Sequence, residues 1–190
     1  MRERMNLEQA LPWRQETTRA LELEELIDQH QSMVFSLAWR MTGDRSLAEE
    51  IAQDVLLELD RNLTRFGSAD HARFWLRKVT MHRSTDALRR RQRREPGWEK
   101  GFWVELEERH GLVEPESDSP LGTRIEALLA ELPEPQRAAL ILRYQEEMTP
   151  DEIADTLNSP LATVKSHLQR GLKRLRTMAS QTLKEYIRGT

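Results

Sequence analysis

The sequence predicts an all-α protein with two small helical domains joined by a linker. The 190 residues include only 8 Gly and 8 Pro, a composition that disfavours turn-rich β architecture. Apolar residues recur at three- and four-residue spacing in both halves of the chain, as amphipathic helices require. The acidic stretch between the halves lacks that spacing and contains Pro96, Pro115 and Pro120, which is typical of a linker.

These features divide the chain into five segments. A length of 190 residues fits two compact domains of modest size. We expect an N-terminal extension over 1–22, a helical domain over 23–94, a linker over 95–121, a second helical domain over 122–180 and a C-terminal tail over 181–190. The linker also carries Trp98, Phe102 and Trp103, which are apolar enough to dock either on a neighbouring domain or on a partner.

The first domain is expected to contain three helices. The first helix has a periodic apolar stripe and can end at Gly43, which adopts the left-handed conformation easily. The second begins with Ser46-Leu-Ala-Glu49, the pattern of a capping box. The third starts near Asp70, which can act as its N-cap, after a loop at 64–69.

The second domain is expected to end in two helices that meet across a short turn. In its first half, Pro133 stops one short helix, and another helix covers 136–144. Thr149-Pro-Asp-Glu152 then combines an N-cap hydroxyl, a proline at the first helical position and a reciprocal glutamate. Asn158-Ser-Pro160 supplies a residue that tolerates the left-handed conformation, a second candidate N-cap and another proline. This spacing predicts a helix-turn-helix.

The second helix of this motif separates apolar from polar residues. Its apolar side is formed by Leu161, Val164, Leu168, Leu172 and Leu175. Its polar arc is formed by Lys165, Ser166, Gln169, Arg170 and Lys173. Such a helix can lie in the DNA major groove, with base contacts near its N-terminus and its cations on phosphates. The solvated face of an ordinary helical bundle has the same pattern, so the pattern alone leaves both interpretations open.

Positive charge is concentrated in two segments, although the formal net charge is -3. Residues 66–94 contain nine basic and two acidic residues, and 160–177 contain five basic residues and no acid. The segment 95–118 between them contains eight acidic and two basic residues. Because a phosphate backbone responds to local charge, both basic segments suit a polyanion. The cluster from Arg89 to Arg94 is the strongest signal, since like charges repel unless a polyanion or an acidic surface is near.

Composition disfavours several other classes of protein. The lack of cysteine removes disulfides, thiolate metal sites and a cysteine nucleophile, and it fits a reducing cytosol. The five histidines lack the HExxH spacing, so no metal site is expected. No apolar stretch is long enough to span a bilayer, and residues 1–20 are too polar for a signal peptide. We therefore expect a cytoplasmic protein.

Seven short sequence blocks carry a family resemblance. They are Ala48–Val55, Phe74–Arg77, Asp86–Arg90, Leu132–Arg137, Leu142–Tyr144, Glu152–Ala154 and Thr163–Ser166. The first three are similar to region 2, and the last four closely resemble region 4, of the extracytoplasmic-function (ECF) sigma factors of bacterial RNA polymerase. Together the two matched regions cover most of residues 23–178.

The resemblance implies a transcription initiation factor that is not an enzyme and needs no cofactor. Such a protein would bind core RNA polymerase at the clamp helices of the largest subunit and the flap of the second largest. Region 4 would recognise the minus-thirty-five element of promoter DNA, and region 2 would recognise and open the minus-ten element. An anti-sigma factor is a further expected partner, and no membrane insertion is implied.

Residue roles follow from the resemblance by position. The upstream element would be contacted by Thr163, Lys165, Ser166, His167, Gln169, Arg170 and Lys173. The minus-ten element would be contacted by Phe66, Arg73, Trp75, Arg77, Lys78, His82, Arg83, Arg89 and Arg90. The polymerase would be contacted by Glu50, Gln53, Asp54 and Glu58. Within the second set, Phe66 and His82 would contact the flipped minus-ten base.

Each of these groups also has a structural interpretation. The acidic stripe suits a basic partner, but an ordinary solvated face has the same spacing. Phe66 in a loop can stack on an unpaired base, which is worth about 1–3 kcal/mol in single-strand binders, although a loop phenylalanine more often caps a core. His82 stands where many family members have asparagine, and it can instead be satisfied within its own domain. His167 and Leu172 stand where arginine is common, so the promoter sequence does not follow by analogy.

Two other functions compete with this interpretation. A stand-alone helix-turn-helix regulator that binds operators would also contain a domain like region 4. Such regulators usually carry an α/β receiver or ligand domain, whereas residues 23–94 have a helical, basic pattern. The second competitor is a pure interaction module or an enzyme that uses the pair Asp70 and His71. Such an enzyme would need both side chains at one point, which adjacent residues of a helix do not provide. The sigma-factor interpretation is therefore favoured.

Overall fold

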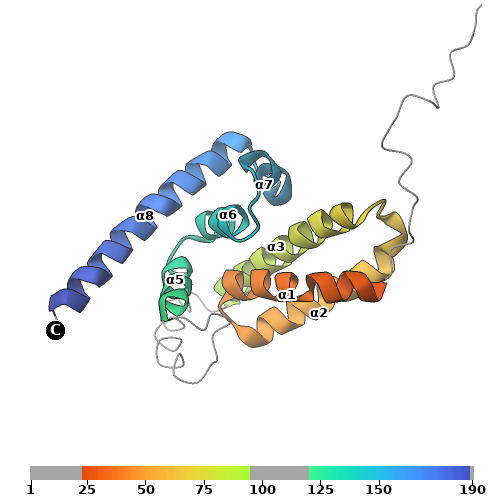
Figure 1. The fold of residues 1–190 in the computed structure, drawn as a ribbon, viewed down its shortest axis with the longest axis horizontal. Helices are drawn as coiled ribbons and strands as arrows, with labels where there is room; N and C mark the ends of the chain where they lie inside the picture. Colours follow the sequence, from red (N-terminus) through yellow and green to blue (C-terminus); the bar gives the residue numbers. More distant parts are fainter. Residues whose placement is uncertain (1–22, 95–119, 189–190) are drawn as a thin grey trace, which may run out of the picture.

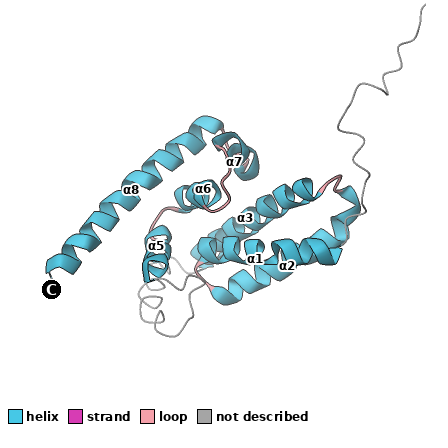
Figure 2. Cartoon of the chain, viewed as in Figure 1, coloured by secondary structure: helices cyan, strands magenta, loops and turns pink. Residues whose placement is uncertain are grey.

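The computed structural model describes residues 23–94 and 120–188, and every regular element in these two ranges is a helix (Figures 1 and 2). The elements in chain order are α1 (Leu23–Thr42), α2 (Arg45–Asn62), the short 3-10 helix η3 (Leu63–Arg65), α3 (Ala69–Arg94), α5 (Pro120–Ala130), α6 (Glu134–Tyr144), α7 (Pro150–Leu157) and α8 (Leu161–Arg188). The all-α prediction is confirmed. The predicted extension 1–22 and the linker aromatics lie outside the described residues.

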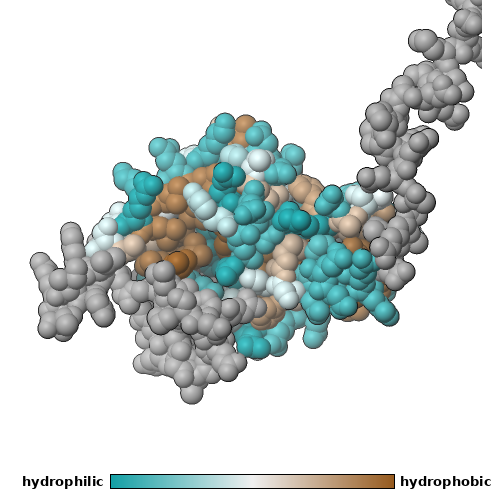
Figure 3. All heavy atoms as spheres, in the orientation of Figure 1, coloured by the Kyte–Doolittle hydropathy of each residue, from teal (hydrophilic) through white to brown (hydrophobic). Residues whose placement is uncertain are grey.

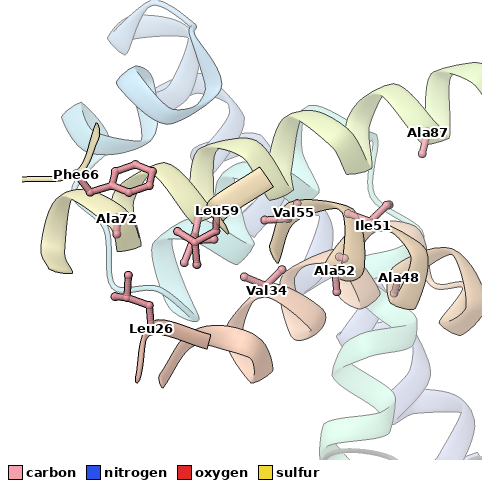
Figure 4. Close-up of a cluster of buried hydrophobic side chains, with 12 residues drawn as sticks. Leu26, Val34, Ala48, Ile51, Ala52, Val55, Leu59, Phe66, Ala72 and Ala87 are labelled. Carbon is pink, nitrogen blue, oxygen red and sulfur yellow. The ribbon is translucent and has the colours of Figure 1, made fainter. Parts of the chain in front are cut away.

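The N-terminal domain is a three-helix bundle in which α1 packs on both α2 and α3. Its core consists of aliphatic residues at helical spacing, which the periodicity predicted. Figure 4 shows Leu26 and Val34 of α1 directed toward Val55 and Leu59 of α2, and Phe66 covers one end of the cluster. The bundle therefore buries one side of α3 and leaves most of the arginines near its C-terminal end exposed.

The ends of the N-terminal helices differ in part from the predictions. Gly43 ends α1 at φ 67, as predicted. The predicted capping box at Ser46 is wrong, because Asp44 is the N-cap of α2 and accepts a hydrogen bond from the Leu47 amide at 3.0 Å. Asp44 has the extended backbone that an N-cap needs, with φ -113 and ψ 114, whereas Ser46 already lies inside the helix.

The start of α3 shows a similar difference. The Ser68 hydroxyl accepts a hydrogen bond from the His71 amide at 3.2 Å, and the helix begins at Ala69. Asp70, the predicted N-cap, therefore lies in the first turn, where its negative charge still favours the helix N-terminus. In both cases a polar residue two positions earlier than expected caps the helix.

The C-terminal domain consists of α5, α6, α7 and α8, with α8 packed across α6 and α7. The predicted helix at 136–144 is confirmed as α6, which begins two residues earlier. The second helix of the motif runs on to Arg188, so most of the predicted C-terminal tail continues α8. Ser159 is not an N-cap, because its hydroxyl donates to the Leu157 carbonyl at 3.2 Å.

The two domains pack on each other and share a hydrophobic core. In this shared core Leu37 and Met41 of α1 and Met81 and Leu88 of α3 meet residues of α6, α7 and α8. The residues from the C-terminal domain are Ala138, Ile141, Leu142, Met148, Ile153 and Val164. Figure 1 shows α6 and α7 lying along the α1–α3 side of the bundle. Periodicity predicted both helical domains, but it did not predict this joint core.

The described residues contain neither a membrane-spanning helix nor a cluster of metal ligands. None of the helices in the ranges 23–94 and 120–188 combines the length and apolar character that crossing a bilayer requires. Over the same ranges, no group of three or more His, Asp or Glu side chains is arranged to hold a metal ion.

Candidate nucleic-acid interface

The helix-turn-helix is fixed by a capping box and a left-handed turn. The Thr149 hydroxyl accepts from the Glu152 amide at 3.3 Å, and the Glu152 carboxylate accepts from the Thr149 amide at 2.7 Å. The hydrogen bond from the Thr149 backbone, followed by that from its side chain, lowers the pKa of Glu152. Asn158 then takes φ 51 and ψ 47, and α8 begins three residues later. The predicted helix-turn-helix is confirmed in the capping box that starts α7 and in the left-handed turn at Asn158 that ends it.

The N-terminal part of α8 presents the predicted polar arc to solvent. Thr163, Lys165, Gln169, Arg170 and Lys173 are exposed, and Ser166 and His167 are half-buried. The opposite side of the helix is anchored by fully buried Val164, which packs with Ile153 of α7. We call the seven residues Thr163, Lys165, Ser166, His167, Gln169, Arg170 and Lys173 the recognition face.

A glycine allows α8 to lie close to α6. A Cβ atom at Gly171 would come within 2.8 Å of Leu140 Cδ1 and 3.5 Å of Gln136 Cβ. Glycine inside a helix ordinarily weakens it, so this close approach is the physical reason for its presence here. The contact holds α8 against the domain along its inner side and leaves the recognition face directed outward.

The predicted minus-ten residues on the arginine-rich helix α3 differ in how exposed their side chains are. Arg73, Arg89 and Arg90 are exposed, whereas Arg77 is buried. The half-buried members are Trp75, Lys78, His82 and Arg83. The structure therefore places all of the predicted set except Phe66 along α3, and it does not leave the whole set accessible at once.

Arg77 and Arg89 are paired with carboxylates from the other domain. Arg77 Nε donates to Glu146 Oε2 at 2.8 Å, and both side chains are almost fully enclosed. Arg89 Nε donates to Glu134 Oε2 at 3.3 Å near the surface. The Thr85 hydroxyl also donates to Glu134, at 3.3 Å. These contacts place carboxylates against cations that the family resemblance assigns to DNA.

Phe66 lies in the core in this conformation. Only 8% of the residue is exposed. Its ring centroid is 5.5 Å from that of His71 and 5.3 Å from that of Trp75. Of the two interpretations of this loop aromatic, the geometry matches a core cap here, and stacking on a base requires the 66–68 loop to move.

The predicted polymerase-binding stripe on α2 touches the predicted DNA-binding set. Glu50, Gln53 and Asp54 are exposed. Arg83 of α3 pairs with Asp54 at 3.0 Å and with Glu58 at 2.5 Å. The acidic stripe and the basic helix thus form one continuous surface, in which one arginine bridges two predicted roles.

Arg137 is a structural residue whose role the sequence did not predict. Its guanidinium donates to the Leu129 and Ala130 carbonyls at the end of α5 and to the Leu132 carbonyl in the turn that follows. It also donates to Met41 O, at the end of α1, at 2.6 Å. The sequence did offer one sign of this role, which is an arginine within the largely apolar stretch 132–142. A charged side chain in such a stretch is buried only when it is paired.

An apolar groove runs between α1, α5, α6 and α8 and has a volume of about 640 Å³. Figure 3 shows apolar residues gathered on this side of α8. The groove is lined chiefly by Ile125, Leu128, Leu129, Tyr144, Leu172 and Leu175. Tyr144 is 62% exposed and Ile125 is 47% exposed, which makes this the clearest apolar surface of the described C-terminal domain.

A helix-turn-helix with an outward basic face, joined to a bundle with an arginine-rich helix, defines a DNA-binding protein with two reading elements. Family models agree with this division. The sigma-70 region 2 model matches residues 26–94, and the sigma-70 region 4 model matches residues 123–175.

Whole-chain comparisons give the same family. The chain is 30% identical over 160 residues to the ECF RNA polymerase sigma factor SigK of Mycolicibacterium vanbaalenii, covering 78% of this chain and 77% of SigK. It is 31% identical over 154 residues to SigE of Mycolicibacterium smegmatis, covering 80% of this chain. The match spans 60% of the length of SigE. The chain therefore belongs to the ECF RNA polymerase sigma factors.

A solved structure confirms the fold. The sigma factor RpoE of Bartonella quintana, solved in complex with the anti-sigma factor NepR, superposes with a TM-score of 0.65 at 18% identity. The match covers 83% of this chain and 96% of that one. The arrangement of two helical domains is thus shared with a sigma factor of low sequence similarity.

Proposed function

We propose that this sigma factor directs core RNA polymerase to a set of promoters and promotes opening of the DNA there. The observation that carries the proposal is the exposed recognition face of α8, held by a complete helix-turn-helix in a chain that belongs to this family. A helix exposed in this way can enter a major groove and present its N-terminal residues to base edges. The protein supplies recognition and positioning to the polymerase and has no catalysis of its own.

The recognition face is proposed to read the upstream element. Lys165 and Gln169 are one helical turn apart and both exposed, so they can contact neighbouring base pairs. Arg170 and Lys173 lie further round the same arc and suit phosphates. His167 has a buried Nδ1 without a hydrogen-bond partner among the described residues, and its ring can contribute to recognition only through the remaining edge.

The α3 surface is proposed to bind the minus-ten element. Arg73, Arg89 and Arg90 supply positive charge for the backbone of the separated strands. Phe66 and Trp75 are adjacent aromatics that can stack on unpaired bases once the loop moves. His82 is half-buried on the same helix and is proposed to contact the flipped base.

Two surfaces are proposed for the polymerase. The acidic stripe of α2, with Glu50, Gln53, Asp54 and Glu58, is assigned to the clamp helices of the largest subunit. The apolar groove beside α8 is assigned to the flap of the second largest subunit, since an exposed apolar surface of this kind marks a protein interaction site. By analogy with the NepR complex, an anti-sigma factor is a further proposed partner, and the cytoplasm is the proposed location.

Run-off transcription tests the proposed function. Core polymerase, purified without sigma factors, is combined with this chain and fragmented genomic DNA, and the transcript starts are sequenced. We expect starts at a small set of sites that share an upstream and a minus-ten element, and none without the chain. Tight binding to specific DNA with no new transcript would instead support a stand-alone helix-turn-helix regulator.

A further inference from the structure

Two acceptor atoms in the lining of the apolar groove beside α8 lack hydrogen-bond donors among the described residues. Gln145 Oε1 and Glu126 Oε1 are both buried there without a hydrogen-bond partner. The Gln145 amide nitrogen donates to Ser36 Oγ at 3.3 Å, which fixes the side chain in place. Arg40 Nε lies 3.7 Å from Glu126 Oε1, an ion-pair distance that is too long for a hydrogen bond.

These atoms define the chemistry of an occupant for the groove. The hollow of about 640 Å³ is lined mainly by aliphatic side chains, so the occupant has to bring apolar surface. A buried acceptor costs free energy until a donor reaches it, so the occupant also has to bring an N–H or O–H group. Large side chains that combine a ring with a single donor meet both requirements.

The linker of the same chain contains side chains of this kind. We call residues 98–106 the aromatic segment, whose apolar members are Trp98, Phe102, Trp103, Val104 and Leu106. The segment lies outside the described residues, so the sequence alone identifies it. An indole N–H donates and accepts nothing, and Trp98 and Trp103 therefore pair a large apolar ring with the donor that the groove lacks.

The described helices place both ends of the linker close to the groove. Arg91, in the last turn of α3, contacts Asp44 at 2.9 Å, just beyond the end of α1. Arg40, in the last turn of α1, pairs with Glu126 of α5 in the groove lining. The aromatic segment begins four residues after α3 and ends 14 residues before α5. Because 14 residues span up to about 46 Å, the connection to α5 does not restrict docking.

The charges of the segment and of the groove rim are complementary. Residues 95–118 contain eight acidic and two basic residues. Arg176 lines the groove on α8, and both it and the neighbouring Arg174 are exposed. Acidic side chains that flank the apolar members, such as Glu105, can therefore face a basic rim while the aromatic rings enter the hollow.

We propose that the aromatic segment docks in the apolar groove of the free chain and donates an indole N–H to Gln145 Oε1. Attachment at both ends keeps the local concentration of the segment on the order of 1 mM, so even a weak contact fills the groove. The segment and the polymerase flap cannot occupy the groove together, and the flap therefore has to displace the segment. Only this last consequence rests on the proposed function.

The distance between the segment and α8 tests docking in the free, full-length chain. The sequence has no cysteine, so Lys100→Cys in the segment and Thr177→Cys at an exposed position of α8 provide two labelling sites. Spin labels there report the distance distribution by pulsed electron paramagnetic resonance. We expect a narrow distribution, which Ile125→Asp should broaden because it adds a like charge at the exposed edge of the groove. Leu57→Asp, at a similarly exposed position of α2, is the matched control and should leave it narrow.

Binding of a peptide supplies a second readout that leaves the groove itself unchanged. The probe is a fluorescein-labelled synthetic peptide of residues 95–109, added to full-length chains. The linker variant combines Trp98→Ala, Phe102→Ala and Trp103→Ala. If the segment fills the groove in about nine-tenths of the wild type, the peptide should bind the linker variant about tenfold more tightly. The matched control combines Leu112→Ala with Val113→Ala, which shortens apolar side chains elsewhere in the linker and should bind like the wild type.

The outcomes separate docking of the segment from other occupants of the groove and from the proposed function. A broad distribution in the wild type, or a gain in peptide affinity no larger than in the linker control, would overturn docking. A molar mass that rises with concentration, and that Ile125→Asp keeps at the monomer value, would assign the groove to a second copy of the chain and also overturn it. If circular dichroism shows that Ile125→Asp loses helix, the peptide comparison decides. Run-off transcription is scored independently, so either result can fail while the other holds.

Discussion

Arg137 shows how a single buried charge can tie several chain ends together. Its guanidinium donates to carbonyls at the end of α5 and to one at the end of α1, and the residue is only 5% exposed. The last carbonyls of a helix lack partners inside the helix, and a planar cation with several donors is well suited to them. This residue therefore organises both region 4 and the boundary with region 2.

Replacing Arg137 with alanine should destabilise the fold strongly. The substitution leaves buried carbonyls without donors, so we expect a loss of about 3–5 kcal/mol in the free energy of unfolding, measured by urea denaturation. Arg143→Ala is the control, because Arg143 is exposed and donates to one carbonyl, that of Met148. Similar losses in the two variants would contradict the assigned role.

Lys165 and Arg170 belong to the recognition face and should act on DNA without affecting polymerase binding. With the holoenzyme on a mapped promoter, each alanine substitution is expected to weaken binding by about 1–3 kcal/mol where a base is read. Loss of a phosphate contact should also lower the salt dependence by about one unit of slope. Arg61→Ala, at an exposed position of α2, should change neither. Loss of core polymerase binding in both α8 variants would show that the helix is misassigned.

His30 gives region 2 a pH-dependent stability. Its Nε2 is buried without a hydrogen-bond partner among the described residues. Burial lowers the pKa of His30 most, and the positive charges of Arg73 and Arg77 lower it further. Glu146 and Asp70 oppose this shift but do not reverse it. Neutral histidine is therefore the form that the folded state prefers.

Acidification should weaken the fold through His30. Because its folded-state pKa lies below the usual value of 6.5, the stability is fully present above that pH and is lost as the pH falls through the folded-state pKa. Urea denaturation at about pH 7.5 and about pH 5.5 should show this loss, and His30→Gln should reduce it. The exposed His71→Gln is the control and should keep the wild-type difference. An unchanged difference in His30→Gln would exclude this histidine as the cause.

At the scale of helices, local sequence signals predicted correctly where a helix begins when only one residue was a strong candidate for the N-cap. The capping box predicted at Thr149 is present because Pro150 fixes the helix start and the Glu152 carboxylate accepts a hydrogen bond from the Thr149 amide. The Ser46 box failed because Asp44 competes for the same helix, and the Gly43 turn leaves Asp44 in the extended conformation. Capping patterns alone do not rank two polar candidates that lie two residues apart.

Gly171 controls how closely α8 packs on α6. Gly171→Val should destabilise region 4 by about 1–3 kcal/mol, because the added atoms collide with Leu140, which is 2% exposed. Thermal unfolding followed by circular dichroism measures the effect. Ala162→Val, at an exposed position of the same helix, controls for the lower helix propensity of valine. Equal changes in the two variants would mean that the close approach is unimportant.

At the scale of the whole molecule, the shared core should make the two regions unfold together. Leu88 belongs to that core and lies on the region 4 side of α3, 8% exposed. Leu88→Asp places a charge in it and should separate one cooperative unfolding transition into two, as measured by calorimetry. Gln92→Asp, exposed on the same helix, should retain a single transition. Two transitions in the wild type would contradict coupling through this core.

The sequence by itself determined the helices, the helix-turn-helix and the family resemblance, because periodicity, caps and short motifs act between neighbours along the chain. It also identified the arginine-rich α3 and the polar arc of α8 as candidate surfaces. Only the tertiary structure decided which of those side chains are accessible. Arg77 meets Glu146 across 69 positions, and Phe66 turns inward onto Trp75. Such pairings depend on how whole helices pack, which no local pattern encodes.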